Sequence, residues 1–222
     1  MENSMNLARA SGTIGLAALA LLASPYAMAD DTGWYGGISI GQSKAKIDDA
    51  RIAGNLLGSG LSTSSITNDD SDTGYKLFAG YKFNKNFALE GGYFDLGKFG
   101  FTATTAGPGT LNGSIKLQGI NLDAVGIVPV SQAFSLFGRA GVNYAQARDS
   151  FSGSGPVNVS NPSPSKNDTN YNFGLGLQYD LNKSVGMRLG AERYRVNDAV
   201  GNRGDIDLFS AGLVYRFGSG MR

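Results

Sequence analysis

The chain has 222 residues, of which 33 are glycine, 17% are charged, and none is cysteine or histidine. The lack of cysteine excludes disulfides and thiolate metal sites, and the lack of histidine excludes serine–histidine catalytic triads and imidazole metal ligands. A net charge of +1 argues against a nucleic-acid partner, because nucleic-acid-binding domains carry a strong basic excess.

Residues 1–29 have the organisation of a secretory signal peptide. A short polar start is followed by a largely apolar run at Ala10–Ala23, which is shorter than the about 20 residues of a spanning helix. An Ala-Met-Ala sequence supplies the small residues of a cleavage site, so we expect cleavage between Ala29 and Asp30. A secreted chain without cysteine is more typical of the bacterial envelope than of a eukaryotic extracellular space.

From Trp34 onward, apolar residues recur with a period of two, which is typical of β-strands with two different faces. The segments reach or exceed the about 9–11 residues of a membrane-spanning strand, whereas strands in soluble proteins average about 5–6. Eight segments show the pattern, and in chain order they are Trp34–Ser43, Thr73–Phe83, Phe87–Gly97, Lys116–Val128, Phe134–Ala147, Thr169–Leu181, Val185–Val196 and Ile206–Phe217.

The connections between these segments alternate between short and long. The tight links are 84–86, 129–133 and 182–184, and the long links, rich in Gly, Ser, Asn and Asp, are about 44–72, 98–114, 148–168 and 197–205. Such alternation is typical of outer-membrane barrels, which must close because lipid cannot satisfy a free strand edge. The sequence therefore predicts an all-β fold, an eight-stranded antiparallel transmembrane β-barrel with short periplasmic turns and long extracellular loops. The barrel is expected over 30–217, with a short extension at 218–222.

Aromatic residues on the apolar face of the predicted strands gather in two groups, one near each end. About eight residues of tilted strand separate the groups, a rise of ~20 Å, close to the ~25 Å apolar band between the aromatic girdles of outer-membrane barrels. Aromatic residues in the core of a soluble β-sandwich would not gather in this way at the two ends of the strands. The predicted girdle residues are Trp34, Phe83, Phe87, Phe134 and Tyr179 at the short-turn end, and Tyr75, Tyr93, Tyr144 and Tyr171 at the long-loop end.

The opposite face of the strands carries charged residues that would point into the barrel. An eight-stranded barrel is just wide enough for side chains to fill it, and buried charges must be paired. One interpretation is a structural ion-pair network that plugs the lumen, and the other is a gate whose pairs exchange partners to pass ions. No cofactor or metal site is expected. The residues predicted to form this interior network are Lys76, Glu90, Asp123, Arg139, Arg188 and Glu192.

Several motifs resemble the OmpA-like eight-stranded outer-membrane barrels. The resemblance rests on Gly33–Gly37, Gly74–Tyr81, Ala88–Phe94 and Gly212–Phe217 and covers essentially the whole chain after the signal peptide. It implies a location in the bacterial outer membrane, with extracellular loops, both termini in the periplasm, and the barrel domain alone, without a peptidoglycan-binding domain.

The resemblance also implies that the last strand is an assembly signal read by the barrel-assembly machinery, with periplasmic chaperones as earlier partners. Here the chain departs from the family pattern, because Gly218–Arg222 follows the terminal aromatic residue. The residues that match the signal are Phe209, Ala211, Leu213, Tyr215 and Phe217.

Enzymatic activity is not expected, since outer-membrane barrels that act as hydrolases resemble one another in using histidine, and this chain has none. The first functional hypothesis is a structural and surface-interaction role of the adhesion type. Lys44–Asp72 and Arg148–Asp168 would contact host cells, phage, lipopolysaccharide or neighbouring cells, while membrane lipid and lipopolysaccharide surround the barrel. The alternative is a narrow passive channel gated by Arg139, Arg188 and Glu90. A hydrophobic carrier of the OmpW type is disfavoured, because the predicted interior is polar and charged.

Overall fold

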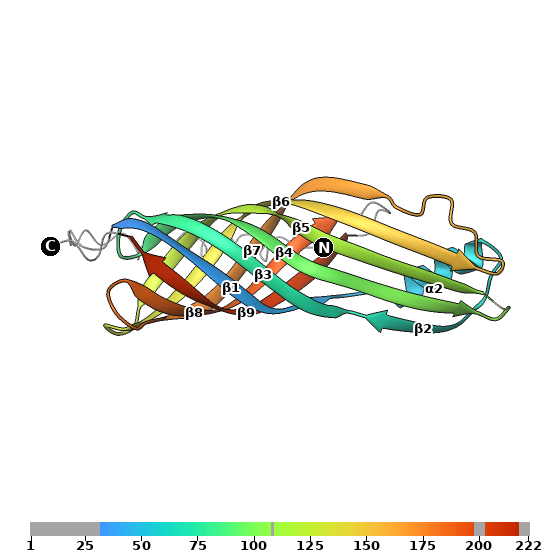
Figure 1. Cartoon of the computed structure of the whole chain (residues 1–222), viewed down its shortest axis with the longest axis horizontal. Helices are drawn as coiled ribbons and strands as arrows, with labels where there is room; N and C mark the ends of the chain where they lie inside the picture. The colour runs from blue at the N-terminus through green and yellow to red at the C-terminus, as the bar shows by residue number, and fades with distance from the viewer. Residues whose placement is uncertain (1–31, 108, 198–202, 218–222) are drawn as a thin grey trace, which may run out of the picture. The chain divides into compact units, whose positions relative to one another are not determined.

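The computed structural model describes residues 32–107, 109–197 and 203–217 as a β-barrel with one helix (Figure 1). The predicted signal peptide, its cleavage site at Ala29 and Asp30, and the extension at 218–222 lie outside the described residues. None of the described helical segments is long and apolar enough to cross a membrane. The elements are β1 (Gly33–Ala45), α2 (Asp49–Gly58), β2 (Thr63–Asp69), β3 (Ser71–Lys82), β4 (Phe87–Thr105), β5 (Thr110–Pro129), β6 (Phe134–Ser154), β7 (Ser165–Asp180), β8 (Val185–Asn197) and β9 (Arg203–Arg216).

All of the strand pairings are antiparallel, and the sheet closes on itself because β1 pairs with β9 and β4 pairs with β5. The strands β2 and β3 lie end to end along one edge of β4, where Asp69 faces Gly100 and Tyr75 faces Asp95. They therefore form a single barrel strand that is interrupted at Asp70. The nine described segments make eight barrel strands, which confirms the predicted fold.

The outer face of the strands carries mainly apolar side chains, whereas the inner face carries glycine and polar side chains together with two groups of buried apolar side chains. Outward residues such as Ile38, Leu77 and Leu175 are more than half exposed, which suits contact with lipid. Inward glycines make room for the large side chains of facing strands. A Cβ atom at Gly176, for example, would collide with the ring of Phe137.

A polar side chain stabilises each of the three tight links. The side-chain oxygen of Asn84 accepts hydrogen bonds from the backbone N–H groups of the residues two and three positions later, and Ser131 and Asn182 do the same in their own turns. This local bonding satisfies backbone donors at the point where the strand pairing ends. The short turns thus stand at the positions that the sequence predicted.

The long connections contain more strand than the sequence predicted. In place of long loops at 98–114 and 148–168, β4, β5, β6 and β7 continue well past the expected strand ends. In β4, a β-bulge between Asp95 and Gly97, where Gly97 adopts a φ of +84°, interrupts the alternation. The extra residue changes which parity faces inward, so that Leu96 and Phe99 are both buried. A prediction that assumes strict alternation of inward and outward residues therefore ends the β4 strand at this bulge.

The connection after β1 contains the helix α2, which the sequence analysis did not predict. The carboxylate of Asp48 caps the helix by accepting a hydrogen bond from the backbone N–H of Arg51 at 3.1 Å. Asn68 on β2 donates to Asp49 at 2.7 Å and ties the helix to the neighbouring strand. Two features of the sequence could have indicated this helix: Asp48 as a cap residue, and the four-residue spacing of Ile52 and Leu56.

Candidate functional site

The barrel interior is filled in three layers. An apolar layer lies toward the short-turn end, a charged layer lies in the middle, and a second apolar layer lies toward the long-loop end. The prediction of a polar and charged interior is therefore right for the middle layer only, because aromatic and aliphatic side chains also occupy inward positions. The first apolar layer contains Tyr35, Phe78, Ala88, Val125, Phe137 and Val214, and the second contains Phe94, Leu96, Phe99, Leu117, Ala145, Ala147, Tyr194, Val196, Ile206 and Leu208.

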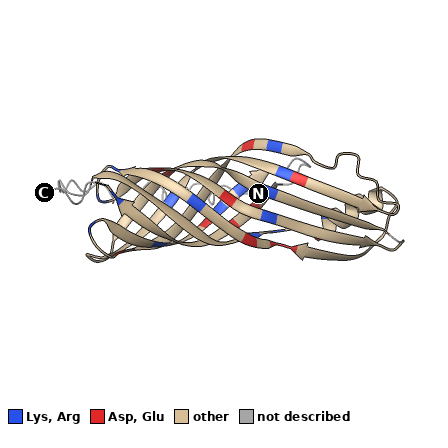
Figure 2. Ribbon diagram, in the orientation of Figure 1, with Lys and Arg blue, Asp and Glu red and all other residues tan. Residues whose placement is uncertain are grey.

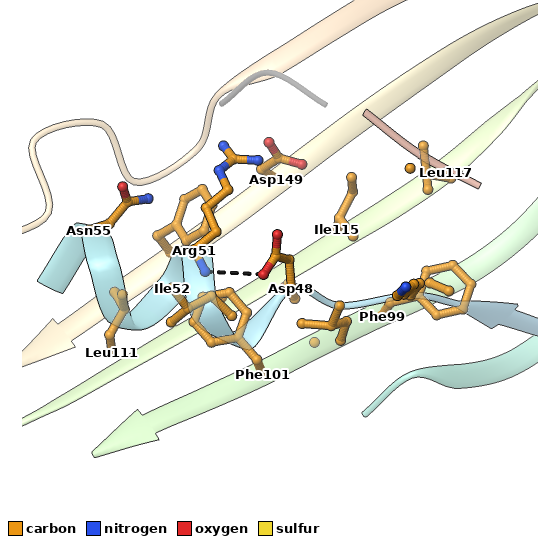
Figure 3. Close-up of a pocket in the computed structure, with 18 of the residues that line it drawn as sticks. Asp48, Arg51, Ile52, Asn55, Phe99, Phe101, Leu111, Ile115, Leu117 and Asp149 are labelled. Atoms are coloured by element: carbon orange, nitrogen blue, oxygen red, sulfur yellow. Dashed lines mark hydrogen bonds between the residues drawn. The ribbon is translucent and has the colours of Figure 1, made fainter. Parts of the chain in front are cut away.

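A cavity of about 510 Å³ lies above the second apolar layer, at the long-loop end. Leu117 and Phe99 line its inner side, and Ile52 of helix α2 lines its outer side (Figure 3). We call it the distal cavity. The sequence analysis did not predict it, because it depends on the helix and on the continuations of β4, β5 and β6.

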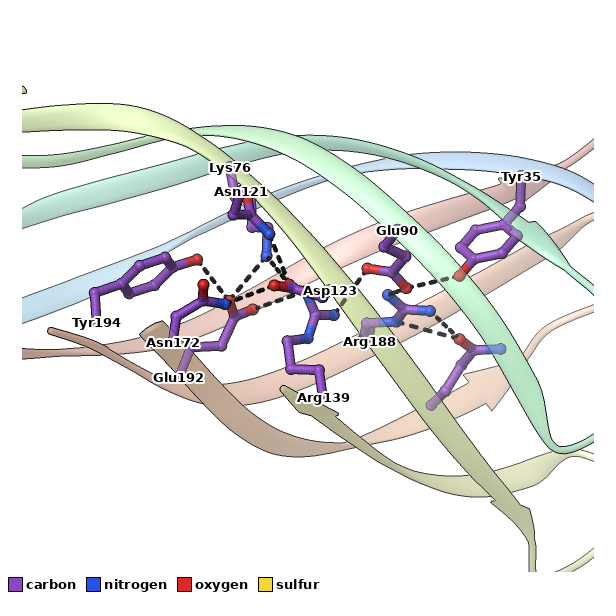
Figure 4. A network of polar contacts seen from close by, with 11 residues as sticks. Tyr35, Lys76, Glu90, Asn121, Asp123, Arg139, Asn172, Arg188, Glu192 and Tyr194 are labelled. Atoms are coloured by element: carbon purple, nitrogen blue, oxygen red, sulfur yellow. Dashed lines mark hydrogen bonds and ion pairs between the residues drawn. The ribbon is translucent and has the colours of Figure 1, made fainter. Parts of the chain in front are cut away.

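The six charged residues predicted for the interior meet in the middle layer and form what we call the central network (Figure 4). Arg139 lies at its centre. Its Nη2 is 3.1 Å from Oε2 of Glu90, and its Nη1 is 3.4 Å from Oε1 of Glu192 and 3.6 Å from Oδ2 of Asp123. A single guanidinium thus bridges three carboxylates that come from three different strands.

The two shortest ion pairs of the central network are formed by its other two cations. Nζ of Lys76 is 2.9 Å from Oε2 of Glu192 and 3.6 Å from Asp123, and Nη1 of Arg188 is 2.7 Å from Oε1 of Glu90. The network holds three cations and three carboxylates, so its formal charge is zero. All six residues are at least 93% buried, and such charges are tolerated only when they are paired.

Two tyrosines, two asparagines and one glutamine complete the central network and were not predicted. Gln178 accepts hydrogen bonds from Nε and Nη2 of Arg188 at 3.2 and 3.0 Å. Tyr35 donates to Oε1 of Glu90 at 2.8 Å, and Tyr194 donates to Oε2 of Glu192 at 2.7 Å. Asn121 and Asn172 donate to the two oxygens of Asp123 at 2.6 and 2.7 Å. The sequence signal that could have identified them is their inward parity, since each shares a strand face with a predicted network residue or a glycine.

Arg188 also contacts the apolar layer below it. Its guanidinium carbon lies 4.6 Å from the ring centre of Phe137 and 5.0 Å from that of Phe78. These cation–π contacts join the charged layer to the aromatic side chains that fill the lumen toward the short turns. The middle of the barrel is therefore packed without a break between the two layers.

The predicted girdle aromatics lie on the outer surface, where Phe87 and Phe134 are half-buried and the other seven are exposed. Trp34 packs edge-on against Tyr81, with ring centres 5.2 Å apart, at the short-turn end. At the long-loop end, Tyr75 donates to Asp95 at 3.1 Å. The predicted assembly-signal residues of β9 and the terminal aromatic that follows it also face outward and are exposed: Phe209, Ala211, Leu213, Tyr215 and Phe217.

Ion pairs mark the end of the apolar band on the long-loop side. Arg193 pairs with Asp207 through two contacts of 2.6 and 2.7 Å, and Arg195 pairs with Asp205 at 2.9 Å. Charged residues gather on neighbouring strands around the middle of the barrel's length (Figure 2). Farther out, hydrogen bonds from Asn197 and from a backbone N–H lower the pKa of Asp168.

Among the described residues, no group of acidic side chains has the arrangement of a metal site.

The family model of the OmpA-like transmembrane domain matches residues 29–221. Outer membrane protein A of Yersinia pseudotuberculosis is 30% identical over 200 residues, which cover 85% of this chain and 49% of that protein. The same protein of Serratia marcescens is 28% identical over 210 residues, covering 92% and 54%. The chain thus spans about half the length of these relatives.

Among solved structures, Neisserial surface protein A matches 83% of this chain and 97% of its own, with a TM-score of 0.54 and 14% identity. At that identity the likeness shows the fold alone. The family match and the motifs that predicted it agree over the whole barrel. The chain therefore belongs to the family of OmpA-like transmembrane domains, and it is a β-barrel of the bacterial outer membrane.

Proposed function

We propose that the protein is a membrane anchor that presents an ordered extracellular surface to partners outside the cell, and that it has no enzymatic activity. The observation that supports this most directly is the length of the strands beyond the girdle at the long-loop end. β4 continues from Tyr93 to Thr105 and β6 from Tyr144 to Ser154. At about 3.3 Å per residue, these continuations are roughly 33 to 40 Å long.

The continued strands form a rigid surface that differs from a set of flexible loops. We call the continuations of β4, β5 and β6, together with α2 and β2, the distal extension (Figure 1). Backbone pairing extends to Thr104 opposite Thr110 and to Thr110 opposite Ser154. A paired surface loses little conformational entropy when it binds, which favours recognition of a partner.

The filled interior supports the same proposal. Two packed apolar layers enclose the central network, so the described part of the barrel is a plug of side chains, and its contribution is stability in the membrane. The proposed orientation has the distal extension outside the cell. β1 begins and β9 ends beside the short turns, as Gly33 faces Lys82 and Tyr35 faces Arg216, and this supports a periplasmic location for both ends of the barrel.

The proposed partners follow from the surfaces of the barrel. Lipid and lipopolysaccharide contact the outer face between the girdles, and the barrel-assembly machinery with periplasmic chaperones handles the chain through its last strand. Host cells or phage contact the distal extension. The hydrolase chemistry of other barrels has no counterpart here, because the chain contains no histidine.

Shortening the distal extension tests the surface-interaction role. The variant replaces Phe99–Ile115, the outer part of the β4–β5 hairpin, by a two-residue Asn-Gly turn, which joins antiparallel strands without strain. Cells that display the full chain are expected to adhere to cultured epithelial cells more than cells without it, and the shortened variant is expected to lose this gain. Equal adhesion by both forms would sink the proposal, provided that heat-modifiable gel mobility shows two folded barrels.

A narrow channel gated by the central network is the second candidate. It is supported by Arg139, whose Nη1 faces two carboxylates at 3.4 and 3.6 Å without a hydrogen bond to a described residue, so that it has alternative partners within reach. Single-channel recording of the refolded chain in a planar bilayer tests it. Discrete current steps that change with Arg139→Ala would support a gate, and silence of both forms across a range of voltages would exclude it.

A further inference from the structure

The distal cavity is lined mostly by apolar side chains that no neighbour covers completely. Phe101, Leu111, Ile115 and Phe151 point inward from β4, β5 and β6, yet each of them is only half-buried. Ile52 of helix α2 faces them from the other side (Figure 3). Apolar surface that remains accessible inside a concave site is stabilised when a ligand removes it from water.

The floor of the distal cavity is closed. Leu117, Phe99, Val196 and Ile206 line its inner side and are at least 95% buried, and they belong to the apolar layer that covers the central network. A molecule that enters from the long-loop end therefore stops above this layer. The volume of about 510 Å³ lies within the ~300–1,000 Å³ of pockets that hold small organic molecules.

Lys46 at the rim of the distal cavity is exposed to solvent, whereas the other charged residues that line the cavity contact neighbouring groups. The carboxylate of Asp48 accepts a hydrogen bond from the backbone of Arg51, and the side chains of Arg51 and Asp149 point toward each other (Figure 3). Asp205 pairs with Arg195 at 2.9 Å. A charged ligand would have to compete with these contacts, whereas an uncharged ligand leaves them in place.

We propose that the distal cavity is a binding site for a small, uncharged hydrophobic molecule with one hydrogen-bonding polar end. The apolar body would lie on Phe101, Ile115 and Phe151, and the polar end would face the amide of Asn55 at the rim. The site is independent of the surface-interaction role, because it uses inward side chains and needs no partner cell.

Binding is tested with the refolded chain in lipid nanodiscs, with aminoanthracene as a neutral fluorescent probe and anthracene sulfonate as its charged counterpart. Empty nanodiscs give the signal that arises from partition into lipid. Saturable binding of the neutral probe above this signal is expected. The sulfonate is expected to bind at least about tenfold more weakly, because an apolar site does not compensate a buried charge.

Two substitutions on helix α2 form a matched pair. Ile52→Asp introduces a charge into the distal cavity and is expected to weaken probe binding by about tenfold or more. Leu57→Asp lies on the same helix, is 66% exposed and does not line the cavity. It is expected to change the affinity by less than about twofold, as surface substitutions usually do. Both lie outside the barrel strands, so both variants retain the barrel.

A second pair tests the cavity from the barrel wall. Ile115→Trp fills the distal cavity from β5 and is expected to abolish binding, whereas Ile120→Trp places the same side chain on the lipid face of that strand and is expected to leave binding intact. The proposal is overturned if the neutral probe shows no saturable binding. It is also overturned if the members of either pair behave alike, or if the sulfonate binds as tightly as the neutral probe.

Discussion

Removing the cation at the centre of the central network is expected to destabilise the barrel strongly. In Arg139→Met, three buried carboxylates face the two remaining cations, so the layer acquires one uncompensated negative charge. Glu90 loses its 3.1 Å partner, and Glu192 and Asp123 lose contacts of 3.4 and 3.6 Å. Removal of one partner from a buried ion pair costs about 3–5 kcal/mol, and the bridging position of Arg139 favours the upper part of this range.

A second substitution is expected to restore most of this loss. Arg139→Met combined with Asp123→Asn leaves two cations and two carboxylates. The remaining pairs are the shortest in the network, Lys76 with Glu192 at 2.9 Å and Arg188 with Glu90 at 2.7 Å. The double variant should therefore be more stable than Arg139→Met alone, although it contains one more substitution.

Urea unfolding in lipid vesicles measures both effects. Trp34 is the only tryptophan and lies on the lipid-facing surface, so its emission reports whether the barrel is in the membrane. Arg216→Met is the control, because its ion pair with Asp180 is partly solvent-exposed and is expected to contribute about 1 kcal/mol or less. A loss below about 1 kcal/mol in Arg139→Met, or additive losses in the double variant, would show that the charge balance does not stabilise the barrel.

Three further outcomes are expected. Gly176→Val should lower the unfolding free energy by about 1–3 kcal/mol through overpacking against the backbone carbonyl of Leu189 and the ring of Phe137, whereas Gly126→Ala, with open space at its Cβ, should have little effect in the same urea assay. The lowered pKa of Asp168 predicts stabilisation that is present above the unfolded pKa of about 3.9 and is lost as the pH falls through the folded value. Hydrogen exchange at the outer end of β7, corrected for its intrinsic pH dependence, should therefore rise in acid, and Asn197→Ala should weaken this dependence. Phe217→Ala should reduce the fraction of heat-modifiable barrel in the outer membrane if the last strand is an assembly signal.

The predictable part of this protein is the part with a strict period of two. Each barrel strand exposes one parity to lipid, so a single segment such as Thr73–Phe83 already contains the information about both faces. The charges of the central network were identified in the same way, since Lys76 and Glu90 stand on the parity opposite the apolar residues. Their burial then follows from closure of the barrel, which lipid imposes on any sheet with free edges.

The parts that could not be predicted depend on a broken period or on distances across the barrel. The bulge at Gly97 shifts the parity of β4, and the distal extension begins beyond it. Tyr35 and Glu90 are 55 positions apart in the sequence, and their hydrogen bond exists because the barrel brings β1 and β4 to face the same interior. A single sequence contains the parity of each residue but not its height in the barrel, so the partners of a tyrosine on the inner face remain undetermined.

The position of each layer along the barrel also determines whether the central network and the distal cavity can affect each other. The central network has no net charge and is covered by Leu117, Phe99 and Leu208, which are almost completely buried. Rearrangement of its ion pairs would therefore open no path to the distal cavity unless this apolar layer also moved, at the cost of its packing. For this reason a ligand in the distal cavity and a substitution at Arg139 should have independent effects on the stability of the barrel. The distal half of the barrel can then differ in its surface and its ligand, while the charged layer continues to stabilise the same membrane anchor.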